Sequence, residues 1–208
     1  MQHKQMDTTT YRAYTNIALI KYWGKRNKEL FLPVTSSLSL TLDQFYTETT
    51  LEWSSQSNED TFTLDGQIQD INAIEKVSRF INMFRDLSGI HRPVHVNSTN
   101  HVPTAAGLAS SASAFAALAS ACNDLFETNL SNKELSTYAR RGSGSATRSL
   151  FGGFTVWHKG IGNESDSSFA EMIDEADWDI GMLVVMINKE QKKISSRVGM
   201  EHTIEASP

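Results

Sequence analysis

Residues 103–122, PTAAGLASSASAFAALASAC, are of the types that can hold a phosphate group. The stretch has no charged side chain and one aromatic ring, so little bulk covers its backbone. Gly107 can adopt a positive φ, and Ser110 or Ser111 can cap a helix that begins there. The start of a helix presents unpaired N–H groups and a partial positive charge. The pattern therefore predicts a strand, a tight loop and a helix N-terminus that binds phosphate.

The same stretch has a second interpretation, in which its alanines serve only to let a helix pack closely on a sheet. It is not a Walker A loop, because no Gly-Lys-Ser or Gly-Lys-Thr follows, and it lacks the three glycines of a dinucleotide-binding motif. The sequence alone does not decide between phosphate binding and close helix packing as the role of this stretch.

A second group of polar residues occupies residues 140–153, RRGSGSATRSLFGG. Three arginines, two early glycines and four hydroxyl side chains fall within this short segment; the arginines and hydroxyls are Arg140, Arg141, Arg148, Ser143, Ser145, Thr147 and Ser149. Guanidinium forks and hydroxyl donors suit a diphosphate or a carboxylate. The alternative is a flexible surface turn with solvated arginines.

A third group lies in residues 14–27, YTNIALIKYWGKRN, where an apolar run meets two lysines and two aromatic rings. If the run is a strand, Lys21 and Trp23 face one side and Tyr22 the other, with Lys25 beyond a glycine that allows a turn. This arrangement could hold an anion. Alternatively, the rings close the core and Lys25 is solvated. Residues 192–199, KKISSRVG, repeat the mixture of cations and hydroxyls.

The composition limits the partners and the compartment. A formal net charge of −5 gives no electrostatic reason to expect nucleic acid or an anionic membrane. Cys122 is the single cysteine, so an intrachain disulfide is excluded and a reducing compartment is favoured. The polar N-terminus lacks the apolar core of a signal peptide, and we expect a cytoplasmic protein. His91 and His95 are the closest histidines in sequence, and we expect no metal site built from protein ligands.

Hydrophobic periodicity predicts an α+β fold with helices on one side of a mixed sheet. Residues 1–12 are expected to form a polar lead-in. The expected helices span residues 72–87, 111–126 and 132–140, the last opened by a capping box of Ser131 and Glu134. The expected strands lie within residues 37–53, 61–67 with a turn at Asp65-Gly66, 93–100, 151–158 and 180–188. In residues 37–53, Leu38, Leu40 and Leu42 and then Phe45, Thr47, Thr49, Leu51 and Trp53 are expected on the buried face.

Taken together, the three groups resemble the mevalonate diphosphate decarboxylases of the small-molecule (GHMP) kinase superfamily. The matching stretches are YTNIALIKYWGKRN, VPTAAGLASSASAFAALA, RRGSGSATRSLFGGF and KKISSRVGM, in the order of the family. The resemblance implies a GHMP-kinase-type N-terminal domain over residues 13–190, with a ribosomal-protein-like βαβ fold. Residues 191–208 would begin the connection to a C-terminal domain.

The implied activity is ATP-dependent decarboxylation of (R)-mevalonate 5-diphosphate to isopentenyl diphosphate, with magnesium positioned through ATP. The residues implied to hold ATP are Ala105, Ala106, Gly107, Leu108, Ala109, Ser110 and Ser111. Those implied to hold the substrate are Tyr22, Trp23, Gly24, Lys25, Ser143, Gly144, Ser145, Ala146, Thr147, Arg148, Ser196 and Arg197. Arg148 would grip the carboxylate and Asn16 would orient the reacting end. Lys192 or Lys193 would approach the phosphates.

The catalytic aspartate of this family belongs to a C-terminal domain that we expect this chain to lack. Three hypotheses follow. The chain is the N-terminal portion of such a decarboxylase, active when the rest is supplied; or it is a related kinase that acts on another small alcohol; or it is a non-catalytic module that binds a nucleotide or anion. The resemblance leaves a homodimer open.

Overall fold

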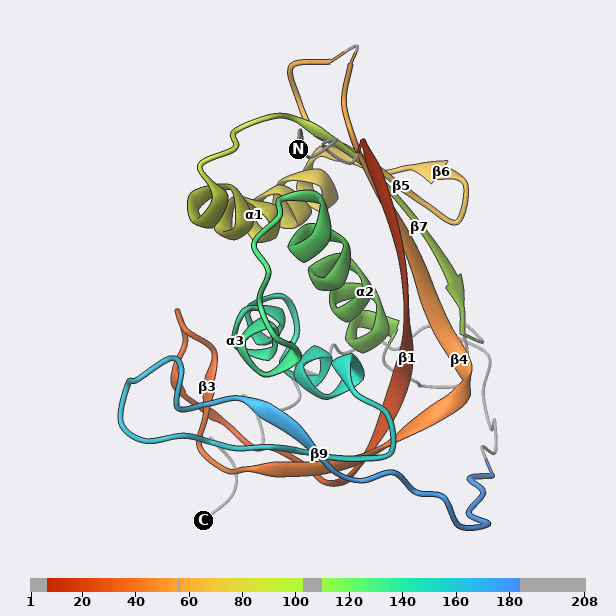
Figure 1. Ribbon diagram of the computed structural model, residues 1–208, viewed down its shortest axis with the longest axis vertical. Helices are drawn as coiled ribbons and strands as arrows, with labels where there is room; N and C mark the ends of the chain where they lie inside the picture. Colours follow the sequence, from red (N-terminus) through yellow and green to blue (C-terminus); the bar gives the residue numbers. More distant parts are fainter. Residues whose placement is uncertain (1–6, 56, 103–109, 184–208) are drawn as a thin grey trace, which may run out of the picture.

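The computed structural model describes residues 7–55, 57–102 and 110–183 (Figure 1). Its strands are β1 (Thr8–Ile20), β2 (Lys25–Asn27), β3 (Leu32–Pro33), β4 (Ser37–Trp53), β5 (Thr61–Leu64), β6 (Gln67–Ile68), β7 (Val94–His101), β8 (Phe154–Trp157) and β9 (Ala170–Asp174). Its helices are α1 (Ile71–Ser88), α2 (Ser110–Leu125), α3 (Asn132–Gly142) and the 3₁₀ helix η1 (Gly144–Leu150). No helix in these ranges is long and apolar enough to cross a membrane.

The long strand β4 organises the sheet. Within the described ranges, seven strands form one sheet in the order β6-β5-β7-β4-β8-β9, and β1 pairs with β4 along its other edge. The C-terminal half of β4 pairs with β7 and its N-terminal end pairs with β8. All pairs are antiparallel except β5 with β7, which are joined through α1. The predicted mixed α+β architecture is confirmed.

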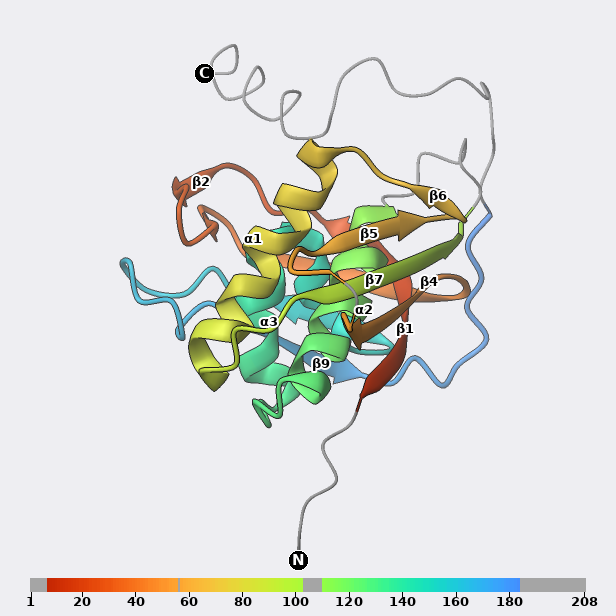
Figure 2. The same cartoon turned by 90° about the horizontal axis from the view of Figure 1, so that it is seen from above.

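The three α-helices lie on the concave side of the curved sheet, and β9 continues the sheet beneath α3 (Figure 1). Helix α1 lies next to β5, whereas α2 packs against β1 and β4 (Figure 2). Residues 8–12 are not part of a lead-in, because they pair with β4 as the first half of β1. The expected strand at 180–188 falls mostly outside the described residues, as does the expected domain boundary near residue 190.

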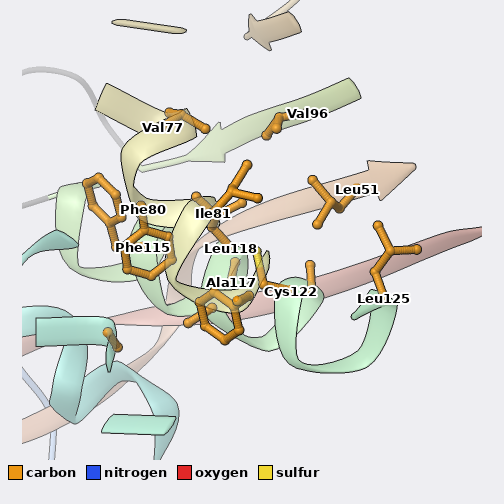
Figure 3. Close-up of a cluster of buried hydrophobic side chains, with 14 of the residues drawn as sticks. Leu51, Val77, Phe80, Ile81, Val96, Phe115, Ala117, Leu118, Cys122 and Leu125 are labelled. Atoms are coloured by element: carbon orange, nitrogen blue, oxygen red, sulfur yellow. The ribbon is translucent and has the colours of Figure 1, made fainter. Parts of the chain in front are cut away.

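Local signals set the ends of α1. The Asp70 carboxylate accepts a hydrogen bond from the Ala73 amide at the N-terminus, and Gly89 closes the helix with φ 73°. This is the left-handed conformation that glycine adopts without steric cost. Val77, Phe80 and Ile81 recur at helical spacing and pack against the sheet and α2, as Figure 3 shows. The helix predicted from periodicity is therefore confirmed.

The alanines of α2 let this helix pack closely. Ala112, Ala116, Ala117, Ala119 and Ala121 are all fully buried. Small side chains on every face allow the helix to contact the sheet, α1 and η1 together. The close-packing interpretation of this stretch is confirmed, and it leaves the phosphate interpretation intact because Ser110 and Ser111, at the start of the helix, are exposed.

The register of β1 against β4 shifts between Tyr14 and Asn16. Such an irregularity changes which side chains face inward. Before the shift Thr9 and Ala13 are the buried residues; after it the Asn16 side chain contacts η1.

The predicted alternation in β4 is confirmed over its second half, where Thr47, Thr49, Leu51 and Trp53 are buried. At its start the alternation does not hold. Ser37 and Ser39 are buried there together with Leu40, whereas Leu38 and Leu42 are half-buried. Residues of η1 cover the two serines, and hydrogen bonding to them removes the cost of burying hydroxyl groups.

Cys122 is fully buried in the cluster of Figure 3, and burial raises the pKa of its thiol. A thiolate must form before a thiol reagent can attack. We therefore expect no reaction with a disulfide reagent such as dithionitrobenzoate in the folded protein over minutes, and full reaction of one thiol in denaturant. Rapid labelling without denaturant would show that the region around α2 opens readily.

Candidate functional site

The segment of residues 140–153 is regular structure, which corrects the alternative of a flexible surface turn. The helix α3 runs to Gly142, and η1 begins at Gly144 with Ser143 between them. Gly142 allows this junction to form, since a Cβ there would lie 2.2 Å from the ring of Phe115 in α2. The junction therefore carries the hydroxyl groups of the segment into the protein interior.

Arg148 of η1 is the buried centre of the site. Its Nε donates to Ser39 Oγ at 3.0 Å, its Nη1 to Ser37 Oγ at 2.6 Å and its Nη2 to Asn16 Oδ1 at 3.3 Å. The residue is 2% exposed. Three neutral partners on β1 and β4 therefore orient the guanidinium, and none of them neutralises its charge.

The charge of Arg148 has no protein counter-ion in the described structure. The ion pairs found there are Arg12–Glu48, Arg85–Asp60 and His158–Glu171. Burial lowers the pKa of Arg148 to about 10, so the group is still a cation at neutral pH. A buried cation without an anion is costly. An anionic ligand bound to the Arg148 guanidinium would offset this cost. A buried charged group of this kind is a candidate for a functional site.

Asn16 ties β1 to η1. Its Nδ2 donates to Ser149 Oγ at 2.8 Å and to the Ser145 carbonyl at 3.0 Å, while its Oδ1 accepts from Arg148. The amide therefore has a defined orientation. Asn16 and Arg148, both named as site residues from the resemblance and 132 positions apart in sequence, are in direct contact in the structure.

Arg140 has a structural role, which the sequence did not distinguish from that of Arg148. It is fully buried, and it donates to the carbonyls of Leu30 at 2.8 Å and Ser168 at 2.6 Å and to Ser165 Oγ at 2.5 Å. These bonds join α3 to two distant loops. Backbone carbonyls cannot be exchanged for a ligand without opening these loops, so Arg140 is not available for binding.

Tyr22 and Gly144 bring the third and second sequence groups into contact. A Cβ on Gly144 would lie 2.9 Å from the Cζ and Oη atoms of Tyr22. Tyr22 also packs edge-on against Trp157, with ring centroids 4.9 Å apart. The ring is therefore held between β8 and the start of η1, and only glycine at position 144 leaves room for it.

The segment before Lys25 keeps the predicted two-sided arrangement outside a strand. Because β1 ends at Ile20, residues 21–23 lie beyond the strand, but Lys21 and Trp23 are exposed whereas Tyr22 is half-buried against Trp157, as the alternation predicted. Trp23 is exposed, and its amide donates to Thr35 Oγ1 at 2.8 Å. Gly24 makes the expected turn with φ 64°. The Lys25 ammonium lies 3.7 Å from the centre of the Phe31 ring, which corrects the alternative of a simply solvated lysine.

The start of α2 lies beside the same junction. Ser111 Oγ is 3.3 Å from Ser143 Oγ, which is 3.2 Å from Ser145 Oγ. No acidic side chain occupies the first turn of α2. A row of hydroxyls therefore leads from the positive end of a helix toward the segment that holds Arg148, and two anionic groups could be bound next to each other.

Comparison with known proteins identifies this arrangement. Residues 13–170 match the family of diphosphomevalonate decarboxylase-like N-terminal domains. The chain belongs to this family. The diphosphomevalonate decarboxylase of Ganoderma lucidum is 40% identical over 218 residues, which cover 96% of this chain and 54% of that relative. The chain thus spans about half the length of the curated relatives it matches.

Two solved structures of the decarboxylase family agree closely with the fold. One, of MDDEF in complex with MVAPP, AMPPCP and magnesium, has a TM-score of 0.84 and 50% identity, and the match covers 96% of this chain and 61% of that one. The other concerns mevalonate diphosphate-mediated ATP binding by the mevalonate diphosphate decarboxylase of Enterococcus faecalis. It has a TM-score of 0.83 and 49% identity, over 96% of this chain and 60% of the other. The GHMP-kinase-type fold is therefore confirmed.

Several residues that the resemblance assigns to the decarboxylase site lie outside the described part of the chain. They are Ala105, Ala106, Gly107, Leu108 and Ala109 in the expected ATP-binding stretch, and Lys192, Lys193, Ser196 and Arg197 near the C-terminus. Within the described part, the structure brings together Asn16, Tyr22, Ser111 and the segment 143–148.

Three residues of the site were not predicted from the sequence. They are Ser37 and Ser39, which orient Arg148, and Trp157, which holds Tyr22. Ser149, one of the predicted hydroxyls, binds Asn16. A signal for the serines was available, because serine at alternate positions of a strand is compatible with a buried polar face. It could not be interpreted without knowing that an arginine covers that face.

Proposed function

We propose that this chain carries the substrate-binding and nucleotide-binding part of an ATP-dependent diphosphomevalonate decarboxylase, which converts (R)-mevalonate 5-diphosphate to isopentenyl diphosphate. The single observation that carries the proposal is Arg148, a buried cation held by three neutral side chains and lacking an anionic partner in the described structure. A carboxylate of the substrate would neutralise it. The named activities of the matched relatives support the same conclusion.

The residues have distinct proposed roles. Arg148 binds the carboxylate through its guanidinium, and Asn16 holds Arg148 and the Ser145 carbonyl in place so that the reacting end of the substrate has one orientation. Tyr22 and the hydroxyls of Ser143 and Ser145 face the diphosphate, together with Lys25. A compact lysine and several hydroxyls provide the charge and the donors that a diphosphate requires.

ATP fits the start of α2, where the amides of the first turn carry no acidic neighbour and Ser110 and Ser111 are exposed. ATP with magnesium supplies the phosphoryl group that turns the tertiary 3-hydroxyl into a leaving group. We propose that magnesium is held mainly by the phosphates. The site residues then orient the substrate so that loss of the leaving group draws electrons from the bond to the carboxylate.

Calorimetric titration of the chain tests the proposal. We expect binding of mevalonate 5-diphosphate, weaker binding of mevalonate without the diphosphate, and tighter binding of ATP once mevalonate 5-diphosphate is present. No binding of mevalonate 5-diphosphate would contradict the proposal. Assays with ATP separate the chemistries: a decarboxylase together with its remaining domain releases carbon dioxide, whereas a kinase accumulates a phosphorylated alcohol and releases none.

The setting of the protein is also a proposal. We place it in the cytoplasm, which agrees with a single buried cysteine, and we expect a small-molecule substrate without a nucleic-acid or membrane partner. The domain limits of residues 13–190 and 191–208 remain predictions.

A methyl group at position 144 is expected to displace Tyr22 from the site. In Gly144→Ala the added Cβ would meet the Tyr22 ring at 2.9 Å and Trp157 at 3.2 Å, so the ring must move. Overpacking of this kind costs about 1–3 kcal/mol of stability. We expect a lower midpoint of thermal unfolding and roughly tenfold weaker binding of mevalonate 5-diphosphate, a loss equivalent to about 1.4 kcal/mol.

Gly152→Ala is the matched control for this variant. No atom lies within 4 Å of a Cβ placed there. We expect its stability and affinity to equal those of the unaltered chain. If both alanine variants bind equally well, the contact of Tyr22 with Gly144 has no part in binding.

A further inference from the structure

A chain of side-chain hydrogen bonds crosses the sheet from the β5–β6 turn to helix α2. Asp65 Oδ2 accepts from the side-chain Nδ2 of Asn100 at 3.2 Å, and Asp65 Oδ1 accepts from the backbone N–H of Asn100 at 2.7 Å. Asn100 Oδ1 accepts from Thr47 Oγ1 at 3.0 Å, and Thr47 Oγ1 is 2.8 Å from Ser113 Oγ. The four residues come from the turn, β7, β4 and α2.

The proton positions along this chain follow from its acidic end. A carboxylate only accepts, so Asn100 must present its NH₂ group to Asp65 and its oxygen to Thr47. The hydroxyl of Thr47 therefore donates to Asn100. A hydroxyl has one proton, so Thr47 can only accept in its contact with Ser113. The Ser113 hydroxyl also lies 3.1 Å from the Ser110 carbonyl, so its one proton is shared between Thr47 and Ser110, and the contact connects Thr47 to the first residue of α2 as well.

The position of the chain in the fold links it to the expected ATP site. Asn100 is the second-last residue of β7, and Ser113 lies in the first turn of α2. The sequence between these two residues includes the stretch assigned to the ATP phosphates. Thr47 and Ser113 are fully buried, so water cannot substitute for a lost bond between them.

The turn at the acidic end is itself rigid. Asp65 and Gly66 have φ values of 52° and 76°, which suit a tight two-residue hairpin turn, and the Asp65 amide donates to the Ser98 carbonyl at 2.9 Å. The turn is therefore attached to β7 by backbone as well as by side chain. The turn therefore has a fixed position, and the hydrogen bonds through Asn100 and Thr47 connect it to α2.

We propose that Thr47, Asn100 and Asp65 are positioning residues for nucleotide binding. By joining the end of β7 to the first turn of α2, they hold the exposed Ser110 and Ser111 and the amides beside them at the orientation that the ATP phosphates require. The inference rests on the proposed function, because it takes the start of α2 as the ATP site. None of the three residues contacts ATP in this proposal.

The molecule contains a matched control for this chain. Thr49, two positions from Thr47 on the same face of β4, forms a 2.8 Å hydroxyl pair with Ser98. Thr49 is fully buried, as Thr47 is, but its pair joins β4 to β7 alone and reaches no helix. Replacing either threonine with valine keeps the shape of the side chain and removes one buried hydroxyl.

The test compares Thr47→Val, Thr47→Ser and Thr49→Val by calorimetric titration with ATP and magnesium in saturating mevalonate 5-diphosphate. We expect Thr47→Val to weaken ATP binding about tenfold, the size of effect that one lost hydrogen bond produces. Thr47→Ser should retain the affinity. Thr49→Val should lower the unfolding temperature to a similar degree, with ATP affinity changed less than twofold.

Asp65→Asn provides a second variant if Thr47→Val does not fold. Its turn is preserved because asparagine also accepts positive φ, and we expect about threefold weaker ATP binding. Equal ATP affinities in Thr47→Val and Thr49→Val, or undiminished affinity in Asp65→Asn, would overturn the positioning role and leave the proposed function standing. Failure of the unaltered chain to bind ATP would instead contradict the nucleotide part of the proposed function, and the inference would be lost with it.

Discussion

Arg148→Gln is expected to weaken binding of mevalonate 5-diphosphate about 100-fold or more. Truncating one member of a buried pair of charges removes both the attraction and the hydrogen bonds, at a cost of about 2–5 kcal/mol. Glutamine still offers an amide donor to Ser37 and Ser39, so the fold is expected to survive. Calorimetric titration of the variant, with circular dichroism to confirm folding, measures the effect.

Two further variants show whether the lost affinity for mevalonate 5-diphosphate reflects the planar set of N–H donors of Arg148 or its positive charge alone. Arg148→Lys keeps a cation but not the planar fork, and we expect an intermediate loss of about tenfold. Arg141→Gln removes an exposed arginine of the same segment and should leave affinity unchanged. If Arg148→Gln binds within threefold of the unaltered chain, Arg148 does not hold the carboxylate.

Asp60→Ala is expected to cost about 3–5 kcal/mol of stability, because it leaves a buried cation unpaired. Arg85 makes two bonds to the Asp60 carboxylate, at 2.6 and 3.1 Å, and both side chains are about nine-tenths buried. The Val94 amide also loses its acceptor. Urea unfolding followed by tryptophan fluorescence measures the free energy of unfolding.

The double variant Asp60→Ala, Arg85→Met separates charge from packing. Removing both charges leaves no unpaired ion, so we expect the double variant to be more stable than Asp60→Ala alone. If the double variant loses as much stability as Asp60→Ala and Arg85→Met lose separately when added together, the pair acts by packing and not by charge.

Acid should weaken the same pair. Burial raises the pKa of Asp60, but hydrogen bonds from Arg85, Ser78 and the Val94 amide outweigh it and lower the pKa below its ordinary value. The stabilisation is therefore complete above the unfolded carboxyl pKa of about 4, and it is lost as the pH falls through the lower folded value. In Asp60→Ala the free energy of unfolding should accordingly depend less on pH in the acidic range.

Residues whose roles depend on near neighbours could be predicted from the sequence. The capping box of Ser131 and Glu134, the C-terminal Gly89 of α1 and the Asp65-Gly66 turn are all present as expected. Each acts within a few residues of chain, so its geometry follows from local dihedral preferences and hydrogen bonds. The helices of the fold and the family were predictable for this reason.

Other features could not be predicted, because they depend on contacts between distant segments. Arg140 and Arg148 occur in one short segment, yet one binds backbone carbonyls and the other binds hydroxyls of β4. Ser37 and Ser39 are buried only because η1 covers them. Burial and partner choice are properties of the packed chain, and no local pattern encodes them.

The amino-acid sequence by itself determined the family, the principal helices and the candidate groups of cations and hydroxyls, since these are recorded in residue order and spacing. The tertiary structure alone decided that Arg148 is oriented by side-chain groups of β1 and β4 whereas Arg140 is held by backbone carbonyls, and how Thr47 connects the β5–β6 turn to α2. The physical reason is that the free energy of a buried polar group depends on what packs around it, and those neighbours are brought together only by folding.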